Sequence, residues 1–112
     1  MNRKVYSVMF YESAERDLQS LFDYIRSHDS EKIANAVVSK LEEAVSTLRE
    51  LPERCPFVEI ANTRFDQCRK LTAGRYQVIF KIDGSIVYVY AVFDGRRNYG
   101  EVLRDRLSKH SP

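Results

Sequence analysis

Two strand patterns separated by a two-residue turn are the feature that most constrains this chain. Residues 75–82 and 85–93 are rich in β-branched and aromatic side chains, and the Asp83-Gly84 dipeptide between them is typical of a tight β-hairpin. The two segments are therefore expected to pair as antiparallel strands. One face of the first strand would carry Tyr76, Val78, Phe80 and Ile82 and pack on helices. The opposite face would be polar and cationic, open to solvent or ligand, with Arg75, Gln77 and Lys81.

Two amphipathic helices are predicted ahead of this hairpin. In the first, apolar residues recur three or four positions apart through His28, and Ser13 is the expected N-cap. Asp29 or Ser30 is the expected cap of the second, whose apolar stripe continues until Pro52 stops the helix. Because the joint between them is short, the two helices are expected to form an antiparallel hairpin.

The remaining segments predict shorter elements. Residues 4–11 predict a strand, and apolar side chains on both of its faces favour an inner position in the sheet. Residues 65–71 predict another strand, and residues 99–109 predict a short terminal helix. No element is expected over residues 52–62, where Cys55-Pro56 indicates an extended connection.

The order of these elements predicts an α+β fold. A strand, a helical hairpin, three further strands and a short C-terminal helix (β-α-α-β-β-β-α) would form a mainly antiparallel sheet covered by the helical hairpin. With 112 residues, 44% of them apolar, the chain is expected to form a single domain over residues 1–112. No apolar run approaches the roughly 20 residues of a membrane helix, and the start has no secretory apolar stretch. We therefore expect a cytoplasmic protein with no membrane partner.

Several kinds of active site lack their essential residues. Cys55 and Cys68 have no histidine or second cysteine at a spacing that binds zinc, and are expected to be reduced thiols. The four glycines form neither a Walker loop nor a dinucleotide fingerprint. The two histidines, His28 and His110, are poorly placed to serve a serine or cysteine nucleophile. The sequence predicts neither a metal nor a cofactor.

Positive charge is concentrated in the second half of the chain. Residues 1–60 hold 8 Lys and Arg against 11 Asp and Glu, a net of −3, whereas residues 61–112 hold 10 against 5, a net of +5. Solvated surface charge would explain this asymmetry, and so would a polyanionic or acidic partner. Cations interleaved with tyrosines suit phosphate binding and base stacking. The candidates are Arg69, Lys70, Arg75, Tyr76, Arg96, Arg97 and Tyr99.

Four blocks of sequence together resemble the RelE/ParE superfamily of bacterial toxins. They are Ser13 to Leu18 followed by Tyr24-Ile25, the long second helix ending at Leu51-Pro52, Arg69-Lys70-Leu71 before Gly74 to Phe80, and Val92 to Asn98. The resemblance spans nearly the whole chain and agrees with the predicted order of elements. It implies a RelE/ParE-like fold and the toxin of a type II toxin–antitoxin pair, neutralised by a cognate antitoxin. An antitoxin with an acidic, amphipathic segment would complement the positive half.

The superfamily acts on two kinds of target, and the sequence favours one. Some members cut messenger RNA in the ribosome, and others inhibit DNA gyrase without being known to cut anything. Gln77 stands where the ribonuclease branch typically has an arginine, and Asp94 where some of its members have a histidine. The long helical hairpin and the tail Arg96-Arg97-Asn98 look more like the gyrase branch.

We therefore expect a gyrase inhibitor, with a ribosome-dependent endoribonuclease and a non-toxic antitoxin-binding module as alternatives. Arg75, Arg96, Arg97 and the terminal helix would contact gyrase and DNA without breaking a bond. Arg69 has a structural alternative, in which it pairs with an acidic group of the first two helices. The full set of candidate target-binding residues is Arg69, Lys70, Arg75, Arg96, Arg97 and Tyr99.

Overall fold

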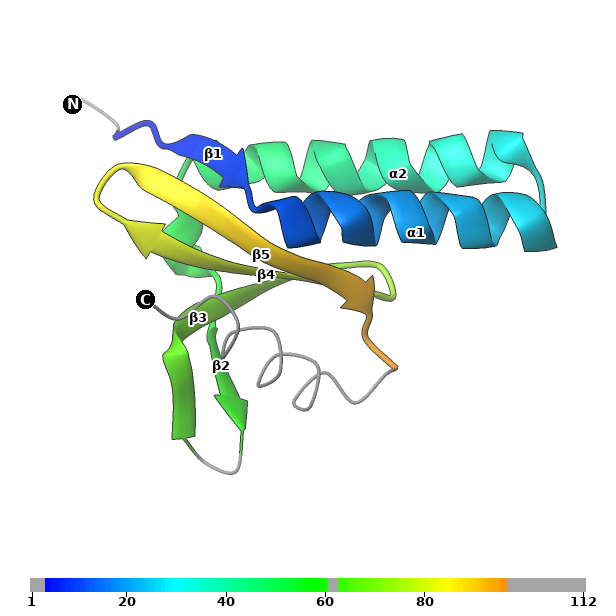
Figure 1. Cartoon of the computed structure of the whole chain (residues 1–112). Coiled ribbons are helices and arrows are strands. Elements are labelled where there is room, and N and C mark those ends of the chain that lie inside the picture. The colour runs from blue at the N-terminus through cyan, green and yellow to red at the C-terminus, as the bar shows by residue number, and fades with distance from the viewer. Residues whose placement is uncertain (1–3, 61–62, 97–112) are drawn as a thin grey trace.

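The computed structural model describes residues 4–60 and 63–96, which form a helical hairpin lying across one face of a sheet (Figure 1). The helices are α1 (Glu12–His28) and α2 (Glu31–Ser46), followed by the 3-10 turns η1 (Thr47–Arg49) and η2 (Pro52–Arg54). The strands are β1 (Ser7–Phe10), β2 (Phe57–Ile60), β3 (Thr63–Ala73), β4 (Tyr76–Asp83) and β5 (Ile86–Asp94). The sheet has the order β1-β5-β4-β3-β2. The α+β expectation is confirmed, and the helix expected at 99–109 lies outside the described residues.

Glycine at the first position of a two-residue turn produces both hairpins of the central sheet. Asp83 pairs with Ile86 in the β4–β5 hairpin, so the turn residues are Gly84 and Ser85, and Gly84 has a φ of 60°. Gly74 begins the β3–β4 turn in the same way, with a φ of 62°. A positive φ at this first position suits the right-handed twist of paired strands, and glycine adopts it without steric cost.

Strand β1 lies at an edge of the sheet, so the inner position expected for it is wrong. It pairs with β5 alone, in parallel, because the helical hairpin carries the chain back across the sheet before the other strands form. Val8 and Phe10 pack against the core under the helices. Met9 is 51% exposed and Val5, before the strand, is 64% exposed. Apolar side chains on both faces therefore did not mean burial on both faces.

Beyond the end of β1, side chains of α1 form hydrogen bonds with the backbone of β5. The hydroxyl of Ser13 donates to the carbonyl of Tyr90 at 3.1 Å, and a carboxylate oxygen of Asp17 accepts from the N–H of Val92 at 2.9 Å. These bonds satisfy backbone groups of β5 and fix α1 over that strand. Ser13 is therefore not the N-cap, and α1 begins after Tyr11 without a side-chain cap.

The second helix begins as expected and ends earlier than expected. The hydroxyl of Ser30 accepts a hydrogen bond from the N–H of Ile33 at 3.1 Å, which is an N-cap contact. The α-helix stops at Ser46, six residues before Pro52, and tightens into η1. Leu51 then adopts a left-handed φ of 52°, which turns the chain toward η2.

Apolar residues are buried on both faces of the sheet, so the face expected to be polar and cationic is apolar at its centre. The helix-side cluster includes Tyr76, Val78, Phe80, Val87 and Val89. The cluster on the other face consists of Val58, Cys68, Ile79, Tyr90, Ala91 and Phe93. The pairing shifts between Ile79 and Phe80, opposite Ala91 and Val89, and this irregularity leaves Tyr90 as an extra residue. Such a bulge changes the alternation of β5, so Tyr90 and Ala91 both reach the second cluster.

The segment 52–62, for which no element was expected, supplies the other edge of the sheet. Strand β2 forms there and pairs antiparallel with β3, Phe57 opposite Arg69. In Figure 1 the β2–β3 hairpin extends away from the helices. Among the described residues, no helix is both long enough and apolar enough to cross a membrane.

The bond between Asp17 and Val92 predicts how much α1 docking contributes to stability. Replacing Asp17→Ala leaves the Val92 N–H without this acceptor, and we expect a loss of about 1–3 kcal/mol in the free energy of unfolding. Asp17→Asn keeps an acceptor oxygen and should lose less. Urea denaturation followed by circular dichroism measures both, with exposed Glu15→Ala on the same helix as the control. Equal stability of Asp17→Ala and Glu15→Ala would refute the role assigned to this carboxylate.

Candidate functional site

An aspartate at the end of β5 holds two arginines at an exposed corner of the molecule. The Asp94 carboxylate accepts from Nε and Nη2 of Arg96 at 3.0 and 2.7 Å, and also from the Arg96 backbone N–H at 3.0 Å. Nε of Arg75, in the β3–β4 turn, lies 3.4 Å from the same carboxylate. The Asp94 side chain is 18% exposed, whereas Arg75 and Arg96 are 53% and 71% exposed. We call these three residues the Asp94 cluster.

The backbone brings the two arginines together because β4 and β5 end side by side. Tyr76, the first residue of β4, pairs with Asp94, the last residue of β5. The N–H of Gly95 then donates to the carbonyl of Arg75 at 2.7 Å. A Cβ at Gly95 would lie 3.1 Å from that oxygen and 3.1 Å from the Gln77 side chain, so glycine permits this close approach.

Hydrogen bonds from Arg96 stabilise the ionised form of Asp94. They lower the pKa of Asp94 to about 2, with a smaller contribution from the charge of Arg75. The same bonds raise the pKa of Arg96, and the nearby Tyr76 and Tyr24 phenols add to this shift. At neutral pH the cluster therefore holds one carboxylate and two guanidinium groups, a net charge of −1 + 2 = +1.

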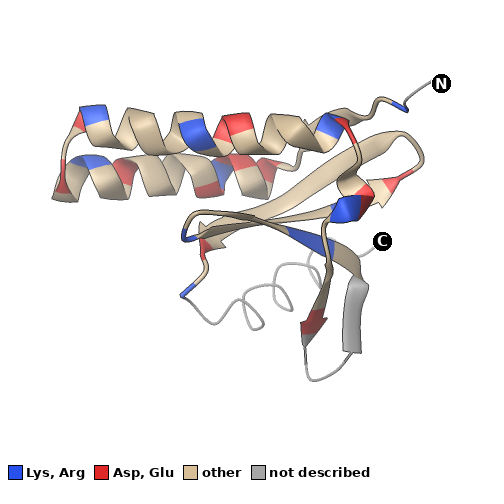
Figure 2. Cartoon of the chain, turned by 180° about the vertical axis from the view of Figure 1, so that it is seen from behind, with Lys and Arg blue, Asp and Glu red and all other residues tan. Residues whose placement is uncertain are grey.

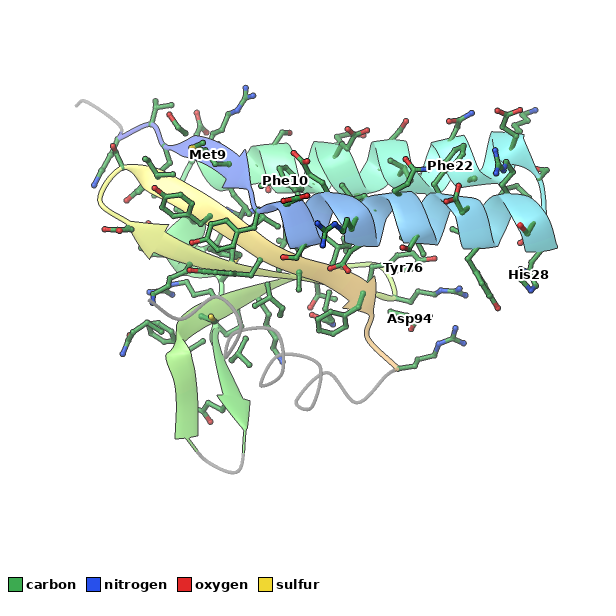
Figure 3. All side chains as sticks on the ribbon, viewed as in Figure 1. Met9, Phe10, Phe22, His28, Tyr76 and Asp94 are labelled. Carbon is green, nitrogen blue, oxygen red and sulfur yellow. The ribbon has the colours of Figure 1, made fainter. Side chains whose placement is uncertain are left out.

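Tyr24, near the end of α1, lies close to this cluster and stacks on His28, and neither residue was predicted as part of the site. Tyr24 is 58% exposed and its ring stacks on that of His28, with centroids 4.1 Å apart. Tyr24 also acts electrostatically on Arg96. Figure 3 shows His28 and Asp94 at the same end of the molecule. The sequence signal was Tyr24 itself, which belongs to the first block of the family resemblance, but its proximity to Arg96 depends on how α1 crosses the sheet.

Arg69 and Lys70 lie within β3, apart from the Asp94 cluster at the start of β4 and the end of β5. Figure 2 shows basic positions both within the sheet and at its outer corner. Arg69 lies opposite Phe80 of β4. It is four residues before Ala73, the last residue of β3, so the two residues are about 13 Å apart along the strand. Its Nη1 donates to the carbonyls of Glu53 and Cys55 at 3.0 and 2.7 Å, and its guanidinium lies 4.0 Å from the Phe57 ring centroid.

These contacts give Arg69 a structural role that differs from the expected one. Its partners are backbone carbonyls of η2 and of the connection from η2 to β2, not acidic groups of the first two helices. Lys70, the next residue, donates its backbone N–H to Pro56 at 3.0 Å in the same region. The structure therefore brings together Arg75 and Arg96 of the predicted set, and places Arg69 and Lys70 elsewhere. Arg97 and Tyr99 lie outside the described residues.

Tyr76 and Tyr90 of the central strands pack in the two core clusters. Tyr76 and Tyr90 are each 8% exposed. Tyr11 packs edge-on against Tyr90, with ring centroids 4.4 Å apart, and is 5.8 Å from Tyr88. Edge-to-face contacts of this kind stabilise packing between neighbouring strands.

With this fold and cluster described, comparison with known proteins gives the family. Residues 8–99 match the family model described as the ParE toxin of the type II toxin-antitoxin system, parDE. The chain belongs to the ParE toxin family. The ParE family comprises the toxins of type II toxin–antitoxin pairs, and the partner of such a toxin is a cognate antitoxin. No curated protein sequence gives a significant match.

Solved structures of related toxins share the fold of this ParE-family chain. A chromosomal ParDE system from P. aeruginosa aligns with a TM-score of 0.69 at 16% identity, covering 81% of this chain and 97% of that one. The RelBE2 toxin–antitoxin complex from Mycobacterium tuberculosis aligns with a TM-score of 0.56 at 24% identity, covering 80% of this chain and 98% of that one. A mutant of the E. coli toxin RelE in the free state aligns with a TM-score of 0.55 at 19% identity, covering 94% of this chain and 97% of that one. The expected RelE/ParE-like fold is confirmed.

The low pKa of Asp94 predicts a stability contribution that depends on pH. The folded-state pKa of about 2 lies below the ordinary 3.8, so the contribution is present above about pH 4 and is lost as the pH falls through 2. Asp94→Asn should cost about 1 kcal/mol at pH 7, because the exposed arginines are screened by solvent. Urea titrations of both proteins from pH 7 to pH 2 should show this difference shrinking. A difference that stays constant over this range would show that Asp94 has an ordinary pKa.

Proposed function

We propose that this ParE-family toxin inhibits DNA gyrase by binding the gyrase–DNA complex through the guanidinium groups of Arg75 and Arg96. Its cognate antitoxin neutralises it. The observation that supports the proposal is the exposed pair of guanidinium groups that the less exposed Asp94 carboxylate holds in place. Together the three groups carry a net positive charge. No bond of the target is broken in this mechanism.

The Asp94 cluster has the properties of a phosphate-binding site. An arginine has five N–H donors, and the contacts with Asp94 use Nε and one Nη2 donor of Arg96 and Nε of Arg75. The remaining donors are on groups that are more than half exposed. Because Asp94 already holds both side chains in place, less conformational entropy is lost when they bind phosphate oxygens.

Asp94 is poorly suited to act as a catalytic base for RNA cleavage. A general base works best when its pKa is near the operating pH, and the Asp94 pKa is about 2. Gln77, at the position where the ribonuclease branch typically has an arginine, adds no charge to hold a developing phosphorane, and its Oε1 accepts a hydrogen bond from Thr72. The cluster therefore supports charge recognition better than proton transfer.

One observation favours the alternative of ribosome-dependent cleavage of messenger RNA. His28 and Tyr24 form a stacked imidazole and phenol pair, and Tyr24 acts electrostatically on Arg96. An imidazole is a common general base or acid, and a guanidinium group stabilises phosphorane charge. In that case His28→Ala would abolish cleavage, whereas gyrase inhibition needs no imidazole.

A supercoiling assay with purified gyrase tests the proposal. The wild-type toxin should inhibit supercoiling, and the double variant Arg75→Ala/Arg96→Ala should require at least about tenfold more protein, since each charged contact contributes on the order of 1 kcal/mol or more. Arg16→Ala is the matched control, because Arg16 is an exposed arginine paired with Glu12 on α1.

Three outcomes separate the candidate functions. Unchanged supercoiling at toxin excess, with messenger RNA cleaved in a translation extract, contradicts gyrase inhibition and supports the ribonuclease. Normal growth on induced expression, with antitoxin binding retained, supports a non-toxic binding module. Growth arrest with DNA damage, relieved by the antitoxin, supports the proposed function.

A further inference from the structure

Tyr24 and His28 form an exposed aromatic pair in the last two turns of α1. They are four residues apart, which places them on the same side of the helix, and their rings lie at an interplanar angle of 23° with centroids 4.1 Å apart. His28 Nδ1 lies 2.9 Å from the Tyr24 carbonyl, which can only accept a hydrogen bond, so Nδ1 carries a proton. This bond fixes the imidazole against the phenol. We call the two rings the Tyr24 stack.

The Tyr24 stack has an open aromatic face. Of the phenylalanine and tyrosine side chains that the structure describes, Tyr24 is the only exposed one, at 58%. The imidazole of His28 covers one face of the phenol ring, so the other face is accessible. An exposed aromatic ring near cations is suited to stacking with a nucleobase.

The docking of α1 on β5 carries Tyr24 toward Arg96. Ser13 and Asp17 contact β5 at positions two residues apart and in the same order, so α1 and β5 run in the same direction (Figure 1). Four helical residues advance about 6 Å and two strand residues advance about 7 Å, so the two elements stay in step. Tyr24 follows Asp17 by seven residues, on the same face of the helix. Its phenol therefore comes close enough to act electrostatically on Arg96.

The end of α1 determines which part of a nucleotide suits the Tyr24 stack. The last carbonyls of a helix carry partial negative charge, which disfavours a phosphate there. A phosphate is favoured instead at the guanidinium groups of Arg75 and Arg96, and a neutral base joined to it can then lie on the Tyr24 ring. Only an unpaired base can do so, because neighbouring base pairs cover the faces of a base inside a duplex.

We propose that Tyr24 is a stacking platform for one unpaired base of the DNA whose phosphate groups Arg75 and Arg96 bind. His28 supports the phenol from behind. The contact tolerates any base, because every base has a π-face. This inference rests on the proposed function for the identity of the nucleic acid, and it adds a preference for DNA with an unpaired base over an intact duplex.

The fluorescence of an introduced tryptophan tests the stacking contact directly. The chain has no tryptophan, so Tyr24→Trp introduces a single indole at the platform. A base that stacks on this indole quenches its fluorescence, and we expect quenching by a single-stranded DNA oligonucleotide. An intact duplex of the same sequence should need at least about tenfold higher concentration for the same effect. The matched control is Val5→Trp, at a position before β1 that is 64% exposed, which should show no quenching.

Binding affinity separates stacking from a purely structural role of Tyr24. Fluorescence anisotropy at low salt measures binding of the same single-stranded DNA carrying a dye. Tyr24→Ala removes the ring and should weaken binding by about tenfold, since stacking of one base contributes on this order. Tyr24→Phe keeps the ring and should bind within about twofold of the wild type. Circular dichroism confirms that each variant is folded.

The outcomes distinguish this inference from the proposed function. Equal affinity of Tyr24→Ala and the wild type overturns the platform, and so does unchanged fluorescence of Tyr24→Trp when DNA is added. Tighter binding of single-stranded RNA than of DNA overturns the assignment to DNA and supports the messenger RNA alternative. Because these titrations contain no gyrase, a failure of gyrase inhibition leaves their result unaffected. Loss of binding in Arg75→Ala/Arg96→Ala, with Tyr24→Ala unchanged, would retain the phosphate site and exclude the platform.

Discussion

The contact between the Asp94 carboxylate and the guanidinium groups of Arg75 and Arg96 is the interaction on which the functional account depends. It joins the end of β5 to the β3–β4 turn and holds two exposed cations at fixed positions. A lone carboxylate at this position would repel a phosphate. Because it is outnumbered by the arginines that it binds, it instead organises a positively charged surface.

The rest of the fold supports this corner through the docking of α1 on β5. The Ser13 and Asp17 side chains bond the backbone of β5 beyond the end of β1, which fixes the helix across the sheet. The same helix then brings Tyr24, which stacks on His28, near Arg96 of the Asp94 cluster.

Local patterns in the sequence predicted the elements well, and contacts between distant segments explain the errors. The hairpin at Gly84, the Ser30 cap and the helical hairpin follow from short-range signals. The edge position of β1, the extra residue Tyr90 and the sheet contact of Ser13 depend on which segments meet in space. For the site, Arg75 and Arg96 were predicted from charge and family resemblance. The separation of Arg69 from them could not be, because its carbonyl partners lie 14 and 16 residues away.

Binding to the gyrase–DNA complex at increasing salt concentration tests the central claim most directly. If Arg75 and Arg96 bind phosphate groups, the affinity of the wild-type toxin falls as the salt concentration rises, because the bound cations displace counterions from the DNA. The Arg75→Ala/Arg96→Ala variant should bind more weakly at low salt and show a shallower dependence. Equal affinity of the two proteins at every salt concentration would contradict the account.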